Sequence, residues 1–347
     1  MANYNNLTMK GSGENKKNSY LHKLIRNGNI HKIKLMLPSI KDINEKNDQG
    51  YPPLLYACEQ ENNDEMLELL LEQENIDPLA QESIEKQNVL HILAFKGKLF
   101  WIVKVFEKFP DLPVDTVTID GNTPLIMAAK MDHIDVIEYL HRKGANINHT
   151  NEKKYTPLHY AAINGYPIST KRLLELGANI DARDDRKCTP LMKTCSWNFL
   201  EICKILVYNA ADIDAQDSLG NTSLAQAVKR GYTEVVKFLL QAGANPNITS
   251  KDNYNNIFTP LISACKLNNI VLVKILIEKG CDVNYPGNDY SEALFQCIRV
   301  GFYDGVLELL KAGVDLCGRN PRNRKTPLEQ AIKFNQDDIA SLIQENL

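Results

Sequence analysis

The sequence lacks the features of a secreted, membrane-bound or strongly charged protein. Its 347 residues contain no run of about 18 apolar residues, the length that a membrane-spanning helix needs. Residues 1–18 are rich in Asn and Lys and have no apolar segment of the kind found in secretion signals. The formal net charge of −3 is too small to draw the whole chain to nucleic acid or to a membrane. We therefore expect a cytoplasmic protein with a disordered tail over residues 1–18, and with neither a nucleic-acid nor a membrane partner.

Motifs for catalysis and for metal binding are also missing. The eight cysteines are scattered through the chain and form neither a CxxC pair nor a Cys/His cluster, so we expect no zinc site and no disulfide framework. No glycine-rich phosphate loop, nucleophile elbow or kinase signature occurs. The sequence therefore predicts a monomeric, non-catalytic protein that holds no cofactor and no metal.

What the sequence does contain is a repeat of 33 to 37 residues. The segments TPLIMAAKMDHIDVIEYLHRKGANIN from Thr123 and TPLHYAAINGYPISTKRLLELGANID from Thr156 are near copies of each other. Ten copies are detectable, and their first positions are Ser19, Pro52, Asn88, Thr123, Thr156, Thr189, Thr222, Thr259, Glu292 and Thr326. The period and the T-P-L-H-x-A motif resemble those of the ankyrin repeat. The resemblance covers residues 19–347.

The better-matched copies share their local signals. Thr followed by Pro, as at Thr123-Pro124, caps and starts a helix. Nine residues after the first position stands Gly, Asn or Asp, with Glu61 as the exception, and this predicts a left-handed residue that ends the helix. A second helix then runs to a further Gly in five copies, and Ala210 takes that position in another. The resemblance implies an all-α ankyrin-repeat solenoid of paired antiparallel helices with β-turn fingers between repeats and atypical capping repeats at both ends.

The period also assigns most of the polar and reactive residues to structure. Six cysteines align with small or apolar positions of other copies and are expected in the core: Cys58, Cys195, Cys203, Cys265, Cys281 and Cys297. Trp101 aligns with apolar second-helix positions and is also expected in the core. Cys188, on a turn tip, and Cys317 are expected to be accessible. Three histidines occupy the fourth motif position, where the resemblance implies that they tie adjacent turns together: His22, His91 and His159.

Positions that differ between copies are candidates for partner binding. Offsets seven and eight from the first position face the groove in ankyrin proteins, and here they include eight basic residues and one acidic residue. Large apolar residues interrupt this row, and aromatic residues stand at turn tips beside it. The predicted partner-binding residues are Tyr51, Phe95, Lys96, Lys130, Met131, Tyr155, Ile163, Trp197, Lys229, Arg230, Phe258 and Lys266. Trp197 is the strongest candidate, because Trp and Tyr dominate interface hot spots.

Several functions fit this pattern. The leading one is a protein–protein interaction scaffold whose concave basic and aromatic groove binds a partner segment, preferentially an acidic one. A second is a host-directed ankyrin effector of an AT-rich intracellular microbe or parasite, which the frequent Asn, Lys and Ile favour. An enzyme with an unrecognised site and a nucleic-acid-binding protein using the basic row are the remaining alternatives, and no motif supports either.

Overall fold

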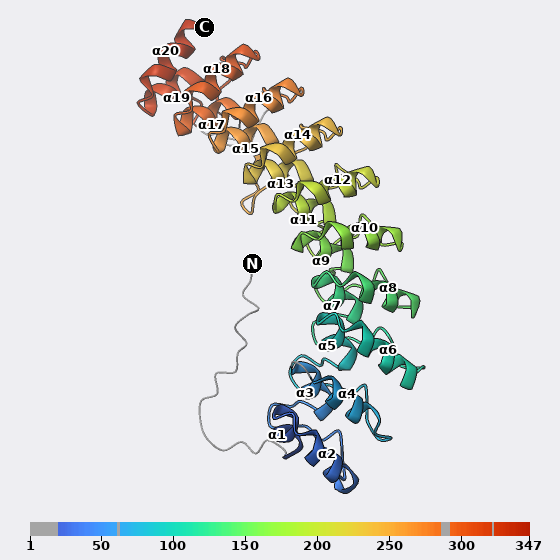
Figure 1. Cartoon of the computed structure of the whole chain (residues 1–347). Helices are drawn as coiled ribbons and strands as arrows, with labels where there is room; N and C mark the ends of the chain where they lie inside the picture. The colour runs from blue at the N-terminus through green and yellow to red at the C-terminus, as the bar shows by residue number, and fades with distance from the viewer. Residues whose placement is uncertain (1–19, 61–62, 286–291, 321–322) are drawn as a thin grey trace. The chain divides into compact units, whose positions relative to one another are not determined.

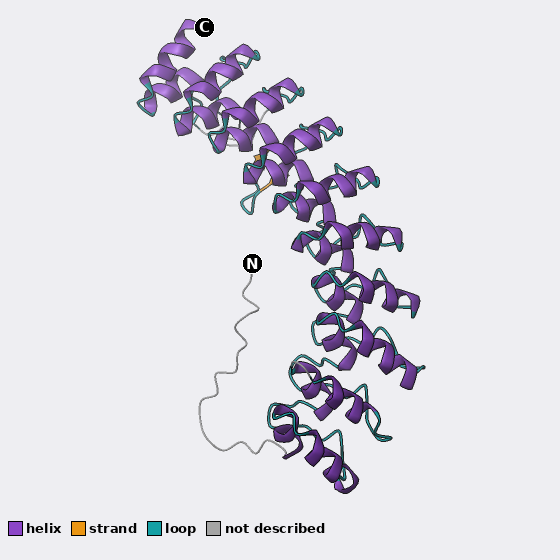
Figure 2. Cartoon of the chain, viewed as in Figure 1, coloured by secondary structure: helices purple, strands orange, loops and turns teal. Residues whose placement is uncertain are grey.

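The computed structural model describes residues 20–60, 63–285, 292–320 and 323–347 (Figure 1). The tail expected over residues 1–18 lies outside the described residues, as does the exceptional Glu61. The regular secondary structure of the described residues is helical apart from one short hairpin, and loops and turns connect the helices (Figure 2). It divides into two compact units, Met1–Ala145 (unit 1) and Asn146–Leu347 (unit 2), which are considered separately below.

Helices occur in pairs along both units. The helices described in unit 1 are α1 Tyr20–Arg26, α2 Ile30–Met36, the 3-10 helix η2 Leu37–Ser39, α3 Pro53–Glu59, α4 Asp64–Leu71, α5 Val89–Phe95, α6 Leu99–Lys108, α7 Pro124–Lys130 and α8 Ile134–Arg142. Those described in unit 2 are α9 Pro157–Asn164, α10 Pro167–Glu175, α11 Pro190–Ser196, α12 Leu200–Tyr208, α13 Ser223–Arg230, α14 Thr233–Gln241, α15 Pro260–Lys266, α16 Ile270–Glu278, α17 Ala293–Val300, α18 Tyr303–Lys311, α19 Pro327–Lys333 and α20 Asp337–Glu345. The strands β1 Ser250–Lys251 and β2 Ile257–Phe258 pair antiparallel between α14 and α15.

The first helix of each pair begins one residue after the first position of its repeat. In six repeats the Thr hydroxyl at that position accepts a hydrogen bond from the backbone N–H three residues later, at 3.2–3.3 Å. This bond satisfies one of the N–H groups that a helix start leaves without a partner. At the other end, all nine described residues at the ninth offset have φ between +54° and +81°. The left-handed ends predicted from Gly, Asn and Asp are therefore confirmed at these nine positions.

Helices pack against their equivalents in neighbouring repeats of the same unit. In unit 1, α3 packs against α1 and α5, and α5 packs against α7. In unit 2, α11 packs against α9 and α13, while the second helices from α10 to α20 pack in their own series. The Leu that follows the motif Pro is fully buried in four repeats, at Leu125, Leu158, Leu191 and Leu261, whereas Leu328 in the last repeat is half-buried. Burial of such a side chain contributes roughly 1.5–3 kcal/mol, which makes this stacking the main source of stability.

The core assignments from the period are confirmed for the six aligned cysteines and for Trp101. All six cysteines are buried, and Trp101 is 5% exposed, with its indole N–H donating to Asp64 Oδ1 at 2.6 Å. Cys317 is exposed, as expected. Cys188 is a correction, because it is only 8% exposed and packs against Met192 and Ala215 instead of standing free on a turn tip.

The turns between repeats are held by one polar side chain each. Asn47 Oδ1 accepts from the N–H groups of Gln49 and Tyr51 at 3.0 and 2.9 Å, which closes the turn by bonding residues two and four positions later. Asn151, Asp184, Asp217 and Asp252 make the same two bonds in unit 2. A turn closed in this way is pre-shaped, so its tip side chains are presented at fixed places.

Candidate protein-binding surface

Five of the predicted binding residues lie in unit 1. Met131 is the C-cap of α7 and is 40% exposed, whereas Phe95 and Lys130, at the ends of α5 and α7, are half-buried. Tyr51 is half-buried on a turn, with its ring centroid 6.5 Å from that of Tyr56. Met131 is thus the most exposed of the predicted apolar contacts in this unit.

Lys96 is engaged within unit 1. Its Nζ donates to the carbonyl oxygens of Cys58 and Glu59 at 3.0 and 2.7 Å and lies 3.7 Å from the Glu59 carboxylate. These carbonyls belong to the last turn of α3, where the helix leaves acceptors without intrahelical partners. Lys96 therefore caps a neighbouring helix, and Glu59 balances its charge, so it adds little to a positive surface.

Unit 2 contains the most exposed aromatic residue of the predicted set. Trp197 is the C-cap of α11 and is 53% exposed, although apolar residues of this size usually lose more surface on folding. Arg230 and Lys266, at the ends of α13 and α15, are exposed, and Ile163 at the end of α9 is half-buried. The ends of the first helices in unit 2 therefore present one large aromatic side chain in the same row as two exposed cations.

Lys229 and Phe258 are drawn into the structure by the hairpin β1–β2. Lys229 Nζ donates to Asn221 Oδ1 and to Ser250 Oγ, and burial is the main cause that lowers the pKa of Lys229. Phe258 was predicted as an accessible turn-tip residue, but it is only 9% exposed, and the ammonium of Lys266 lies 5.2 Å from its ring centroid. Phe258 is thus a correction: pairing with Ser250 sets its position in β2.

The exposed aromatic residue of the hairpin is Tyr254, which the sequence reasoning did not select. It is 86% exposed at the hairpin tip, and Asp252 fixes the turn by accepting from the N–H groups of Tyr254 and Asn256. The hairpin is tied to the preceding turn by the Lys251 N–H, which donates to Leu219 O at 2.7 Å. The available signal was the long linker between Gly243 and Thr259, which has an aromatic residue near its middle.

Tyr155 belongs to a polar cluster that connects a turn with α11. Its ring stacks on His159 at 5.5 Å, and the Lys193 ammonium lies 5.0 Å from the ring centroid and donates to Tyr155 Oη at 3.2 Å. The same ammonium lies 2.6 Å from the fully buried carboxylate of Asp184. Burial acts to lower the pKa of Lys193, but the interactions with Asp184, Cys188 and Tyr155 outweigh it and leave that pKa raised. Tyr155 therefore stiffens this face, with part of its ring exposed.

The motif histidines tie adjacent turns together, as predicted. The Nε2 atoms of His22, His91 and His159 lie 2.8, 3.1 and 3.1 Å from carbonyl oxygens of the next turn, at Tyr51, Asn122 and Cys188. Burial lowers the pKa of both His91 and His159 to about 4. The imidazoles are therefore neutral at pH 7 and act as structural hydrogen-bonding groups.

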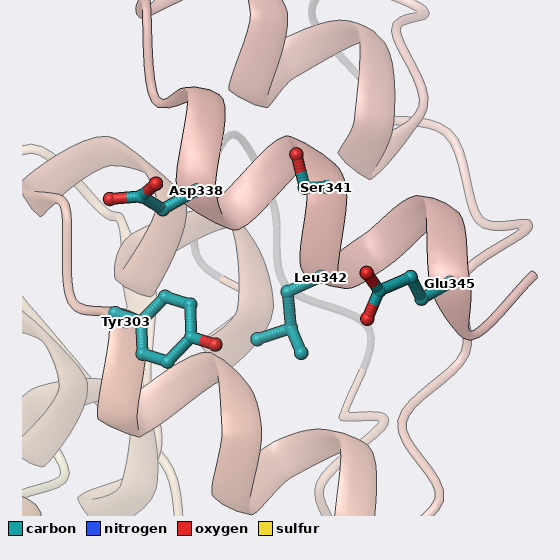
Figure 3. Close-up of a pocket in the computed structure, with 5 residues that line it drawn as sticks. All are labelled: Tyr303, Asp338, Ser341, Leu342 and Glu345. Carbon is teal, nitrogen blue, oxygen red and sulfur yellow. The ribbon is translucent and has the colours of Figure 1, made fainter.

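Open surface depressions occur among the described residues. A surface depression of about 320 Å³ lies between α18 and α20, lined by Tyr303, Asp338, Ser341, Leu342 and Glu345 (Figure 3). In Figure 3, Leu342 lies between Tyr303 and Glu345, and none of the five lining residues is basic. Among the described side chains, no group of three or more His, Cys, Asp or Glu residues could hold a metal ion. None of the described helices has the length and apolarity that crossing a bilayer requires.

The chain is similar to ankyrin proteins of several kinds. It is 28% identical to human transient receptor potential cation channel subfamily A member 1 over 144 residues, which is 41% of this chain and 12% of the channel. It is 37% identical to mouse ankyrin repeat domain-containing protein 53 over 82 residues, covering 22% and 16% of the two chains. It is 35% identical to putative ankyrin repeat protein R664 of Acanthamoeba polyphaga mimivirus over 104 residues, covering 29% and 62%. The chain thus spans less than two thirds of each relative.

Structure and family models agree with these similarities. The crystal structure of the ankyrin repeat domain of Bcl-3 superposes with a TM-score of 0.58 and 26% identity, covering 65% of this chain and 99% of that domain. A family model for ankyrin repeats in three copies matches residues 3–82, 90–184, 169–252 and 248–320. Ankyrin repeats are generally non-enzymatic interaction modules. With most of its length matched by that model, the chain belongs to the ankyrin-repeat family.

Proposed function

We propose that this protein is a non-catalytic scaffold that binds a segment of a partner protein on the face formed by the ends of its first helices. The observation that carries the proposal is Trp197, 53% exposed in a row that also presents Arg230 and Lys266. An exposed indole among cations matches the composition of interface hot spots, where Trp, Tyr and Arg are enriched. The same cations favour a partner segment that carries carboxylates.

The proposal also includes a cytoplasmic location and a monomeric chain. Supporting the location, six of the seven buried cysteines occupy positions that are alanine or valine in other repeats and serve as small apolar residues. Cys195 and Cys203, for example, lie with their sulfur atoms 3.6 Å apart in the core, and burial raises the pKa of the Cys195 thiol well above its usual value.

The test compares an exposed first-helix residue with an exposed second-helix residue. Trp197→Ala combined with Arg230→Glu should remove the proteins that the wild-type chain enriches in affinity purification followed by mass spectrometry. Tyr208→Ala is the matched control, because Tyr208 is 76% exposed but ends the second helix α12. Both variants should keep the wild-type far-UV spectrum and melting temperature. An unchanged set of captured proteins for the double variant would refute the role of this face.

A host-directed effector is the second candidate function. The frequent Asn, Lys and Ile support it, as does the similarity to an ankyrin repeat protein of a virus of amoebae. In this version of the proposal the bound segment belongs to a host protein. Immunofluorescence of infected cells separates the two versions, because confinement of the protein to the producing organism would eliminate the effector role.

A further inference from the structure

Two turns at the start of unit 2 carry an excess of exposed positive charge. Residues 150–155 and 183–188 contain the exposed cations Lys153, Lys154, Arg183, Arg186 and Lys187. The acidic residues on the same turns are Glu152, Asp184 and Asp185. Asp184 is buried, bonds its own turn and pairs with Lys193, so two exposed carboxylates oppose five exposed cations. These two turns are called the basic turns below.

The basic turns form one continuous edge. The Asp185 N–H donates to Lys153 O at 3.1 Å, which joins the two turns through their backbones. The Arg183 guanidinium donates to Lys187 O at 3.1 Å and to Gln216 O at 2.7 Å, which braces the second turn against the third. Their charges are therefore held close together on a pre-shaped backbone, which lowers the entropy lost when an anionic chain binds.

Two of these lysines occupy backbone positions that glycine would adopt more easily. Lys154 and Lys187 have φ of +58° and +60°. The equivalent tip residues are glycine in three other turns, Gly50, Gly121 and Gly220, with φ of +75° to +82°, and Lys86, Asn255 and Arg324 in three more, with φ of +60° to +62°. A side chain in this left-handed region costs free energy that glycine avoids. Such residues cluster at functional sites, where the side chain is needed in spite of its backbone cost.

We infer that the basic turns bind an acidic polypeptide segment that runs along the turn tips of unit 2. The inference rests on the proposed function in taking the partner to be a protein, and it specifies both the chemistry of the segment and a second surface that holds it. Carboxylates spaced along an extended chain can meet Lys153 and Lys154 on one turn and Arg186 and Lys187 on the next. Exposed arginine favours carboxylate, because its planar donors can bond both oxygens.

The experiment uses fluorescein-labelled poly-L-glutamate as the probe and fluorescence anisotropy as the measurement. The wild-type chain should bind the probe, with an affinity that falls as salt is added. Lys154→Gly and Lys187→Gly should each weaken binding by about threefold, as expected for one exposed charge pair, and together by about tenfold. Neither should lower the melting temperature, because glycine suits the left-handed backbone.

Lys86→Gly is the matched control. Lys86 has φ of +61° at the equivalent turn position of unit 1, but its turn also carries Glu82 and Glu85. This variant should bind the probe as the wild-type chain does. Equal losses in all three lysine variants would overturn the inference, as would unchanged binding in the double variant. Tighter binding of a labelled single-stranded oligonucleotide than of poly-L-glutamate would also overturn it.

The proposed function can fail separately. Suppose that Trp197→Ala abolishes capture of the cellular partner while the lysine variants still bind both the partner and poly-L-glutamate. That result would support binding by the first-helix face and refute binding by the basic turns. If the lysine variants bind neither the partner nor poly-L-glutamate and Trp197→Ala still binds the partner, binding by the basic turns is supported and binding by the first-helix face is refuted.

Discussion

Units 1 and 2 are built from the same repeat, yet their turns carry different charges. In unit 1, residues 46–51, 81–87 and 117–122 hold two basic and four acidic residues, whereas residues 150–155 and 183–188 of unit 2 hold five basic and three acidic ones. The backbones of these turns are nevertheless similar, with a polar side chain accepting from N–H groups of the turn and one left-handed residue near the tip, although the 81–87 turn is one residue longer. The comparison teaches that the repeat fixes the turn backbone and leaves the charge of the tip open.

The largest expected effect is a loss of folding stability at acid pH. It tests a feature that both units share, namely a buried histidine that forms a hydrogen bond to the next turn. Burial holds the folded-state pKa of His91 in unit 1 and of His159 in unit 2 at about 4, below the ordinary value of 6.5. The unfolded chain therefore binds more protons between these values, and stability is lost as pH falls from 6.5 towards 4. At pH 5 each histidine should contribute a loss of about 2 kcal/mol in the free energy of unfolding.

Urea denaturation at pH 7 and pH 5 measures this loss. The His159→Leu variant should be less stable at pH 7, because the carbonyl of Cys188 loses its partner, but it should lose less stability between the two pH values. An equal loss of stability in the variant and in the wild-type chain would assign the acid sensitivity to other groups.

The next largest effect is the destabilisation caused by replacing glycine with alanine, and it should differ between equivalent positions in the two units. A Cβ on Gly97 in unit 1 would lie 2.4 Å from His133 Nδ1, whereas a Cβ on Gly231 in unit 2 would meet nothing within 4 Å. Both residues have positive φ, so Gly231→Ala should destabilise by about 1 kcal/mol and Gly97→Ala by about 2–3 kcal/mol. Thermal melts of the two variants side by side would show the difference, and equal shifts would mean that the His133 ring moves aside freely.

The smallest effect is a stabilisation within unit 2. Ala210 has φ of +65° at the position where Gly177 and Gly243 stand in neighbouring repeats. Ala210→Gly relieves a left-handed alanine but gives the unfolded chain more freedom, so the net gain should be about 0.5 kcal/mol. A small rise in melting temperature is expected, and a fall would indicate that the Ala210 methyl group makes a contact that matters.

Most of the fold could be predicted from the period because equivalent positions meet equivalent surroundings. Thr123-Pro124 starts a helix wherever it recurs, and the residue nine positions after the first adopts a left-handed backbone whether it is Gly97 or Asn198. Burial of Cys195 followed in the same way, since alanine stands at its position in other repeats. Local signals and repetition agree at these residues, so the packing confirms what each repeat already favours.

The candidate surface was less predictable because exposure depends on what reaches across from the next repeat. Lys96 was expected to face a partner, but it caps the end of α3. Phe258 was expected at a tip, but the hairpin turns it inward and places Tyr254 outside. Strand register and side-chain reach across a repeat boundary decide these outcomes, and neither is written in the spacing of the repeat.

The sequence by itself determined the repeat, the starts of the first helices and the left-handed residues that end them. The helix starts and the left-handed residues follow from a residue and its nearest neighbours along the chain, and the repeat follows from their recurrence. Only the tertiary structure decided which cations stay exposed and which are engaged, as Lys187 and Lys96 illustrate. The physical reason is that a long charged side chain can reach several partners at similar cost, and the packed neighbours select among them.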